Sequence, residues 1–138
     1  VINKPTRTKL QKIFQVKGFK TINISDLVYS GGPVNQGNII MMHTNEWKCK
    51  NTLPLANGIS ITSDPQMLKK MHEQDQPQAW RVFSGLSIWS PGQLEGEINS
   101  KCWMTAIPTP ELSLETPTTQ IYEKAIEICS KQIIDKYI

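Results

Sequence analysis

Three dipeptides, each a capping side chain followed by proline, constrain the fold of this chain more than any other feature. They are Asp64-Pro65, Ser90-Pro91 and Thr116-Pro117. An Asp, Ser or Thr side chain accepts a hydrogen bond from a free amide of the first helical turn, and proline lacks the amide that would stay unpaired there. Each dipeptide therefore predicts the start of a helix.

Apolar residues recur at helical spacing behind each of these starts. They extend the predicted helices over residues 65–73, 91–100 and 117–135. Ser90 and Gln93 also fit a capping box, in which a side chain at each end binds the amide of the other. A weaker helix is predicted over residues 8–15, and Gly18 follows it as a stop signal.

Between the helices lie five segments with the residue types or the two-residue alternation of β-strands. They cover residues 27–29, 38–43, 59–62, 79–88 and 102–107. Gly85 inside the fourth predicts a bulge or the close approach of another backbone. Several connections are short enough for antiparallel pairing, and no regular βαβ alternation predicts a nucleotide-binding sheet. The expected class is α+β.

Length and composition indicate one domain that spans residues 1–138. A chain of 138 residues can build one hydrophobic core but not two. No run approaches the roughly 18 apolar residues of a membrane helix, and the first residues do not resemble a signal peptide. Three widely spaced cysteines, Cys49, Cys102 and Cys129, suit a reducing compartment and no metal site. We therefore expect a cytoplasmic protein without a membrane partner.

Positive charge is concentrated at the start of the chain. Six of the fifteen basic residues precede the first acid, Asp26, so nine basic residues face twelve acidic ones in the remainder. The six are Lys4, Arg7, Lys9, Lys12, Lys17 and Lys20. Such a stretch can bind nucleic acid, or it can be a solvated lysine-rich helix and loop.

Standard catalytic and cofactor-binding motifs are absent from the sequence. His43, at the end of an apolar strand, is either a buried histidine that donates to a backbone carbonyl or a functional group. We expect no catalytic residue, no metal ligand and no cofactor.

Two loops are candidate binding sites. Gly31, Gly32 and Pro33 follow a strand and form either a tight turn or a nest of amides for an anion. Trp89 precedes a predicted helix start, where free amides and Gln93 could bind a carboxylate or phosphate. The alternative for Trp89 is a hydrophobic staple that packs on the first helical turn.

These loops and four other segments resemble sequence elements of the AlgH/YqgE family, in the same order along the chain. The segments are residues 1–5 (V-I-N-K-P), 30–34 (S-G-G-P-V), 43–44 (H-T), 61–68 (I-T-S-D-P-Q-M-L), 85–98 (G-L-S-I-W-S-P-G-Q-L-E-G-E-I) and 103–106 (W-M-T-A). Leu86 departs from the family pattern, which has an aromatic residue there, and Ser87 replaces a small alanine.

The resemblance implies a mixed, strongly bent sheet that closes toward a pseudo-barrel, with flanking helices. It also implies a bacterial cytoplasmic protein of a family often labelled as transcriptional regulators. In that family V-I-N-K-P is an internal element, so the resemblance predicts a further segment before Val1.

The leading hypothesis is a non-enzymatic regulatory or binding protein that contacts a protein or a small anionic ligand. We expect its surface to combine Gly31, Gly32, Pro33, His43, Trp89, Gln93 and Glu95. One alternative is direct nucleic-acid binding through the basic N-terminal stretch. A weaker one is a hydrolase with His43 or Glu95 as its base.

Overall fold

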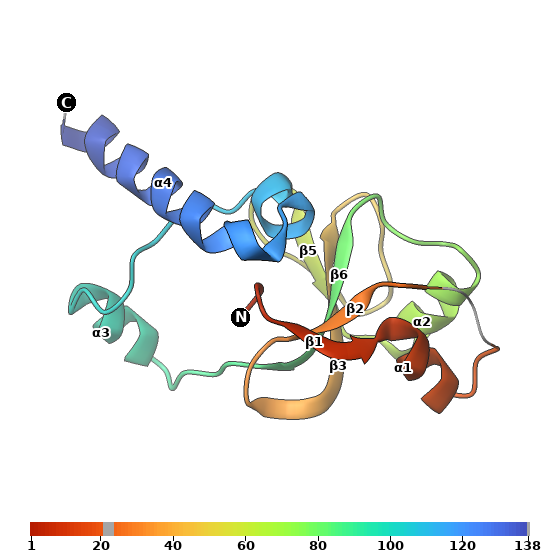
Figure 1. The fold of residues 1–138 in the computed structure, drawn as a ribbon. Helices are drawn as coiled ribbons and strands as arrows, with labels where there is room; N and C mark the ends of the chain where they lie inside the picture. The colour runs from red at the N-terminus through yellow and green to blue at the C-terminus, as the bar shows by residue number, and fades with distance from the viewer. Residues whose placement is uncertain (21–23, 138) are drawn as a thin grey trace.

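The computed structural model describes residues 1–20 and 24–137, and these form one mixed sheet of six strands with helices beside it (Figure 1). In spatial order the strands are β1 (Pro5–Lys9), β2 (Leu27–Ser30), β6 (Trp80–Leu86), β3 (Val34–Thr44), β5 (Ile59–Thr62) and β4 (Thr52–Pro54). Strands β2 and β6 run parallel, and every other neighbouring pair is antiparallel. The α+β class and the mixed sheet are confirmed. The predicted closure toward a pseudo-barrel is not seen in the described residues, because the sheet is open, with β1 and β4 at its edges.

All four predicted helices are present in the described residues. They are α1 (Leu10–Val16), α2 (Pro65–His72), α3 (Gln93–Asn99) and α4 (Thr118–Tyr137), and a short π-type turn, η1 (Glu111–Glu115), precedes α4. None of the helices within residues 1–20 and 24–137 combines the length and the apolar character needed to cross a membrane.

Of the three predicted helix caps, one is confirmed, one is shifted along the chain and one is wrong. The Asp64 side chain accepts from the Gln66 amide at 2.9 Å and caps α2 as predicted. Helix α3 begins two residues later than predicted, because Gly92 adopts φ 77° and becomes the N-cap in place of Ser90. The Thr116 cap is wrong, because its hydroxyl donates to the Glu111 carbonyl of η1 at 2.9 Å.

One predicted strand is wrong and two strands were not predicted. Residues 102–107 pair with no strand in the described part of the chain, and Figure 1 shows this segment running from α3 toward α4. Strands β1 and β4 escaped prediction because they are largely exposed edge strands and lack an apolar alternation.

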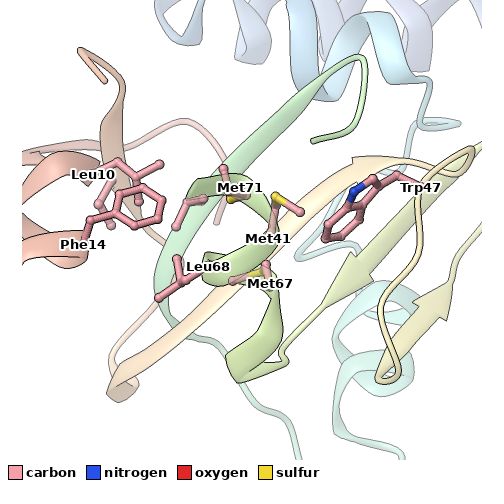
Figure 2. Packing of buried hydrophobic residues seen from close by; sticks show 9 residues of the cluster. Leu10, Phe14, Met41, Trp47, Met67, Leu68 and Met71 are labelled. Carbon is pink, nitrogen blue, oxygen red and sulfur yellow. The ribbon is translucent and has the colours of Figure 1, made fainter. Parts of the chain in front are cut away.

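The main hydrophobic core lies between the sheet and helices α1 and α2. Figure 2 shows Leu10 and Phe14 of α1 and Met67 and Met71 of α2 in this core with Met41 of β3. Helix α3 has no buried residue. In Figure 1, α3 and α4 lie on the side of the sheet away from α1 and α2. Helices α1 and α2 are therefore packed into the main core, whereas α3 is the least packed helix in the described residues.

Candidate functional site

A hydrogen-bonded loop positions the residues around the start of α3. The Gln93 amide donates to the Ser90 carbonyl at 3.0 Å, and the Gln93 side-chain oxygen accepts from the Ser90 amide at 3.1 Å. One half of the predicted capping box therefore forms. The other end of the Gln93 amide group donates to Glu97 Oε1 at 3.0 Å, one helical turn further along.

Two indoles converge on the same carboxylate. The ring N–H of Trp103 donates to Glu97 Oε2 at 2.6 Å, and that of Trp89 donates to the same oxygen at 3.3 Å. The two rings meet edge to face, with centroids 6.1 Å apart. We call Trp89, Gln93, Glu97 and Trp103 the indole–carboxylate cluster.

The hydrogen bonds of the cluster favour the ionised form of the Glu97 carboxylate. Hydrogen bonds from Trp103, then Gln93, and finally Trp89 lower the pKa of Glu97 below its ordinary value. Donors to a carboxylate stabilise its charged state; Gln93 lies in α3 itself, Trp89 precedes the helix and Trp103 follows it. Three hydrogen bonds therefore orient the Glu97 carboxylate.

The end of α3 brings Trp103 back to the cluster. Lys101 adopts φ 60°, its amide donates to the Ile98 carbonyl, and the Cys102 amide donates to the Glu97 carbonyl, each at 2.9 Å. These two bonds form a Schellman motif, which reverses the chain at a helix end. Trp103 follows directly, so its indole lies beside the last turn of the helix.

Exposed apolar side chains stand next to the cluster residues in the sequence. The Trp103 side chain is 50% exposed, and the neighbouring Met104 is 63% exposed. Ile88 and Ile98 are exposed as well. Aromatic and apolar residues of this kind, with a few fixed polar groups among them, are typical of protein–protein contact surfaces.

The structure brings two of the predicted site residues together, and the carboxylate that they contact belongs to Glu97 and not to the predicted Glu95. Trp89 and Gln93 lie in the cluster, whereas Glu95 is exposed and makes no hydrogen bond or ion pair within residues 1–20 and 24–137. Sequence reasoning missed Glu97 and Trp103. The spacing of four between Gln93 and Glu97 was the available signal, but it points to a pair only once the helix start is known.

The glycine turn packs the end of β2 against the end of β6. The Gly31 amide donates to the Ser84 carbonyl at 2.9 Å, and Gly31 and Gly32 are both buried. A Cβ added to Gly32 would lie 2.3 Å from the backbone of Leu86. The geometry supports the tight turn over the anion nest, because the Gly31 amide already has a protein acceptor. Gly85 has φ 78°, and its α-carbon faces the Gly32 carbonyl, which is the close approach that the sequence predicts.

His43 is fully buried, with both ring nitrogens bound. Nδ1 lies 2.7 Å from the Thr44 carbonyl and therefore donates, so Nε2 accepts from the Thr62 hydroxyl at 2.7 Å. Thr62 in turn lies 2.7 Å from the Thr52 hydroxyl. Burial is the main influence on the pKa of His43 and lowers it, so the ring is neutral at physiological pH.

The predicted surface that combines His43 with the glycine turn does not form. His43 pairs with Trp80 at one end of β6, while Gly31 binds Ser84 toward the other end. Four residues of a strand span about 13 Å. His43 is buried among threonines at its own end of the sheet, and Pro33 is the one exposed residue of the turn.

The basic N-terminal stretch lies on the surface. All six of its basic residues are exposed, and none forms a salt bridge within the described residues. Arg7 and Lys9 belong to the edge strand β1. No group of three or more His, Cys, Asp or Glu side chains in the described ranges could hold a metal ion.

Comparison with known proteins gives a consistent result. A family model described as AlgH-like matches residues 1–133. A UPF0301 protein of Proteus mirabilis is 30% identical over 135 residues, which are 93% of this chain and 72% of that relative. A UPF0301 protein of Vibrio parahaemolyticus is 30% identical over 100 residues, which are 72% of this chain and 54% of that relative.

The fold also matches solved structures. The solution structure of the AlgH protein from Pseudomonas aeruginosa aligns with a TM-score of 0.77 and 23% identity, over 93% of this chain and 69% of that one. A crystal structure of a Corynebacterium diphtheriae protein aligns with a TM-score of 0.59 and 22% identity, over 85% of this chain and 64% of that one. This chain spans between about half and three quarters of the length of these matched proteins.

Proposed function

The chain belongs to the AlgH-like family, and we propose that it is a non-enzymatic regulatory or binding protein that captures a protein partner through the indole–carboxylate cluster. The observation that carries this proposal is the pair of partly exposed indoles, Trp89 and Trp103, both fixed by the carboxylate of Glu97. The exposed apolar side chains next to the cluster residues extend the surface.

The cluster has two properties of an effective contact surface. Indoles that are already held edge to face lose little conformational freedom on binding, so less of the contact energy is offset by ordering. Glu97 already accepts three hydrogen bonds, which reduces the cost of covering its charge with a partner. Tryptophan is among the residues that contribute most to protein interfaces.

The candidate catalytic groups support a non-enzymatic role. His43 has no free ring nitrogen to act as a base, and it is closed off from solvent. Glu95 is exposed, and within residues 1–20 and 24–137 its side chain has no hydrogen-bond partner that would orient it. A hydrolase with either residue as its base would lose turnover in His43→Ala or Glu95→Gln.

A protein partner is favoured over a small anionic ligand. Helix α3 carries Glu95 and Glu97 beside the loop that would receive the anion, and like charges repel. In the glycine turn, the Gly31 amide is already bound to Ser84.

Affinity capture from cell extract tests the proposal. We expect the wild-type chain to retain at least one protein that the double variant Trp89→Ala/Gln93→Ala does not retain. Val16→Ala is the matched control, because Val16 is an exposed apolar residue at the end of α1 and lies outside the cluster. Circular dichroism should show that all three proteins fold. Equal capture by the double variant and the wild type would contradict the proposal.

Nucleic-acid binding is a second candidate, supported by the six exposed basic residues near the N-terminus. It predicts an affinity that falls with salt, with a logarithmic slope of about 0.9 for each phosphate contacted on a duplex. Arg7→Gln/Lys9→Gln should reduce that slope in a fluorescence anisotropy titration. The absence of binding at low salt would remove this candidate.

A further inference from the structure

A cavity of about 540 Å³ opens between residues 101–108 and helix α4. Figure 1 shows this segment running from α3 toward α4. We propose that the cavity binds a medium-chain aliphatic carboxylate, with its hydrocarbon chain against α4 and its carboxylate at Lys101. This site is separate from the proposed partner-binding role, although Trp103 borders it as well.

The lining of the cavity suits a hydrocarbon chain. Most of it is apolar, with Met104 and Ala106 on the 101–108 segment and Ile121, Ala125 and Cys129 on α4. Its volume lies within the range of roughly 300–1,000 Å³ that is typical of small-molecule sites. Apolar side chains around such a space gain from an apolar occupant that displaces water.

The charge of the lining selects the headgroup. Lys101 is the one charged residue among the residues that line the cavity, and none of them is Asp or Glu. Among the lining residues, Lys101 is therefore the one cation available to a headgroup at the 101–108 side. A carboxylate complements that cation, whereas an alkylammonium group would be repelled by it.

The backbone at Lys101 adopts the left-handed conformation, which disfavours a side chain. Lys101 has φ 60° at the position of the Schellman motif that glycine usually occupies. Helix α1 ends in the same motif with Gly18 at that position. Lys101→Gly therefore removes this strain together with the ammonium group, and a glycine variant at an equally strained position elsewhere is needed as its control.

Protection of Cys102 from a maleimide measures occupancy of the cavity. Cys102 is exposed and lines the site, while the partly buried Cys49 lies elsewhere and serves as an internal reference. The probes are octanoate, decanoate and dodecanoate, each far below the concentration at which it forms micelles. We expect the half-protecting concentration to fall about three- to fourfold for each added methylene. Absence of protection, or equal protection of Cys49, would overturn the proposal.

Three variants separate the parts of the proposal. Ala125→Trp should fill the cavity and abolish the protection of Cys102. Lys101→Gly relieves the backbone strain and should weaken dodecanoate binding at least tenfold, and Gln74→Gly is its matched control at the end of α2. Thermal unfolding checks that each variant folds. Protection by dodecylamine equal to that by dodecanoate, or unchanged binding in Lys101→Gly, would overturn the assignment of the carboxylate to Lys101.

Discussion

Gly32 and Gly85 allow the ends of β2 and β6 to meet. The backbones at Gly32 and Gly85 approach so closely that any side chain at either position would overlap a carbonyl group of the other strand or its loop. This contact joins β2 and β6, the one parallel pair in the described part of the sheet. The glycine turn is thus a structural element of the fold.

A series of alanine substitutions separates steric overlap from backbone strain. Gly32→Ala should lower the free energy of unfolding by about 3 kcal/mol or more, because its Cβ would meet the backbone of Leu86. Gly92→Ala should cost about 1–2 kcal/mol, because Gly92 has φ 77° but open space around it. Gly96→Ala, in helix α3 without a close neighbour, should gain about 0.5–1 kcal/mol. Urea unfolding measures all three, and equal effects would contradict this account.

Buried His43 makes stability depend on pH. Its pKa is lowered in the folded protein, chiefly by burial, although the Thr44 carbonyl and the charge of Glu46 oppose the shift. Below the unfolded value of about 6.5, the unfolded chain therefore binds more protons than the folded one. The free energy of unfolding should fall as the pH drops from 7.5 to 5.5, with a slope of up to about 1.4 kcal/mol per pH unit.

The variant His43→Gln should be less stable than the wild type at pH 7.5 but lose less stability between pH 7.5 and 5.5. His72→Gln is the matched control, because it removes the other histidine and leaves the buried network of His43 intact. Urea unfolding at both pH values gives the comparison. A pH dependence that survives in His43→Gln would show that another group causes it.

The sequence predicts two of the four residues of the indole–carboxylate cluster. Trp89 and Gln93 were identified because an aromatic residue and a capping side chain precede a helix. Glu97 was missed in favour of Glu95, since the choice between them depends on where α3 begins. Gly92 moves that start to Gln93, and the helical spacing of four then selects Glu97. Trp103 could be assigned only from the chain reversal after the helix.

At the scale of elements, three helices end in the same way. Helices α1, α2 and α3 each close with two backbone bonds of a Schellman motif. The residues in the left-handed conformation are Gly18, Gln74 and Lys101. Glycine adopts that conformation without strain, whereas the two side-chain-bearing residues do not.

Glycine at the two strained positions should therefore stabilise the protein. We expect Gln74→Gly and Lys101→Gly each to raise the free energy of unfolding by about 1 kcal/mol. The reverse change, Gly18→Ala, should lower it by about 1 kcal/mol, because space is open around Gly18 and only its φ of 83° opposes a side chain. Urea unfolding of the three variants checks the signs, and a loss of stability in both glycine variants would contradict the strain argument.

Elements with a local signal could be predicted, and those that depend on tertiary contacts could not. Pro65, Pro117 and the apolar spacing behind them predict the positions of α2 and α4 closely, and the alternation of Ile59–Thr62 predicts the observed bounds of β5. Edge strand β1 carries lysine, arginine and threonine, so its pairing comes from β2 and leaves no apolar pattern. Residues 102–107 have a strand-like composition, but they pair with no strand in the described part of the chain.

At the scale of the whole molecule, packing is uneven. The core joins α1 and α2 to the sheet, while α3 has no buried residue and its half of the chain carries several exposed apolar side chains. Elements with few buried contacts open locally at low free energy. Backbone amides of α3 should therefore exchange with deuterium much faster than those of β3 and β6. Equal protection of α3 and the central strands would contradict this description of the packing.

Most of the exposed large apolar side chains of the described residues lie in the part of the chain that follows β6 and contains α3 and α4. The indole–carboxylate cluster and the cavity beside α4 are both built mainly from this part of the chain. A contact surface in this part of the chain would add the packing that α3 lacks on its own.

Site-specific photo-crosslinking tests the proposed contact surface most directly. A photoreactive amino acid replaces Ile98, which is exposed on α3, or Leu53, which is exposed on the edge strand β4, in otherwise identical proteins. We expect the protein retained by the wild-type chain to crosslink from position 98 and not from position 53, and Trp89→Ala/Gln93→Ala to remove the crosslink. Crosslinks of equal yield from both positions, or a crosslink that persists in the double variant, would contradict it.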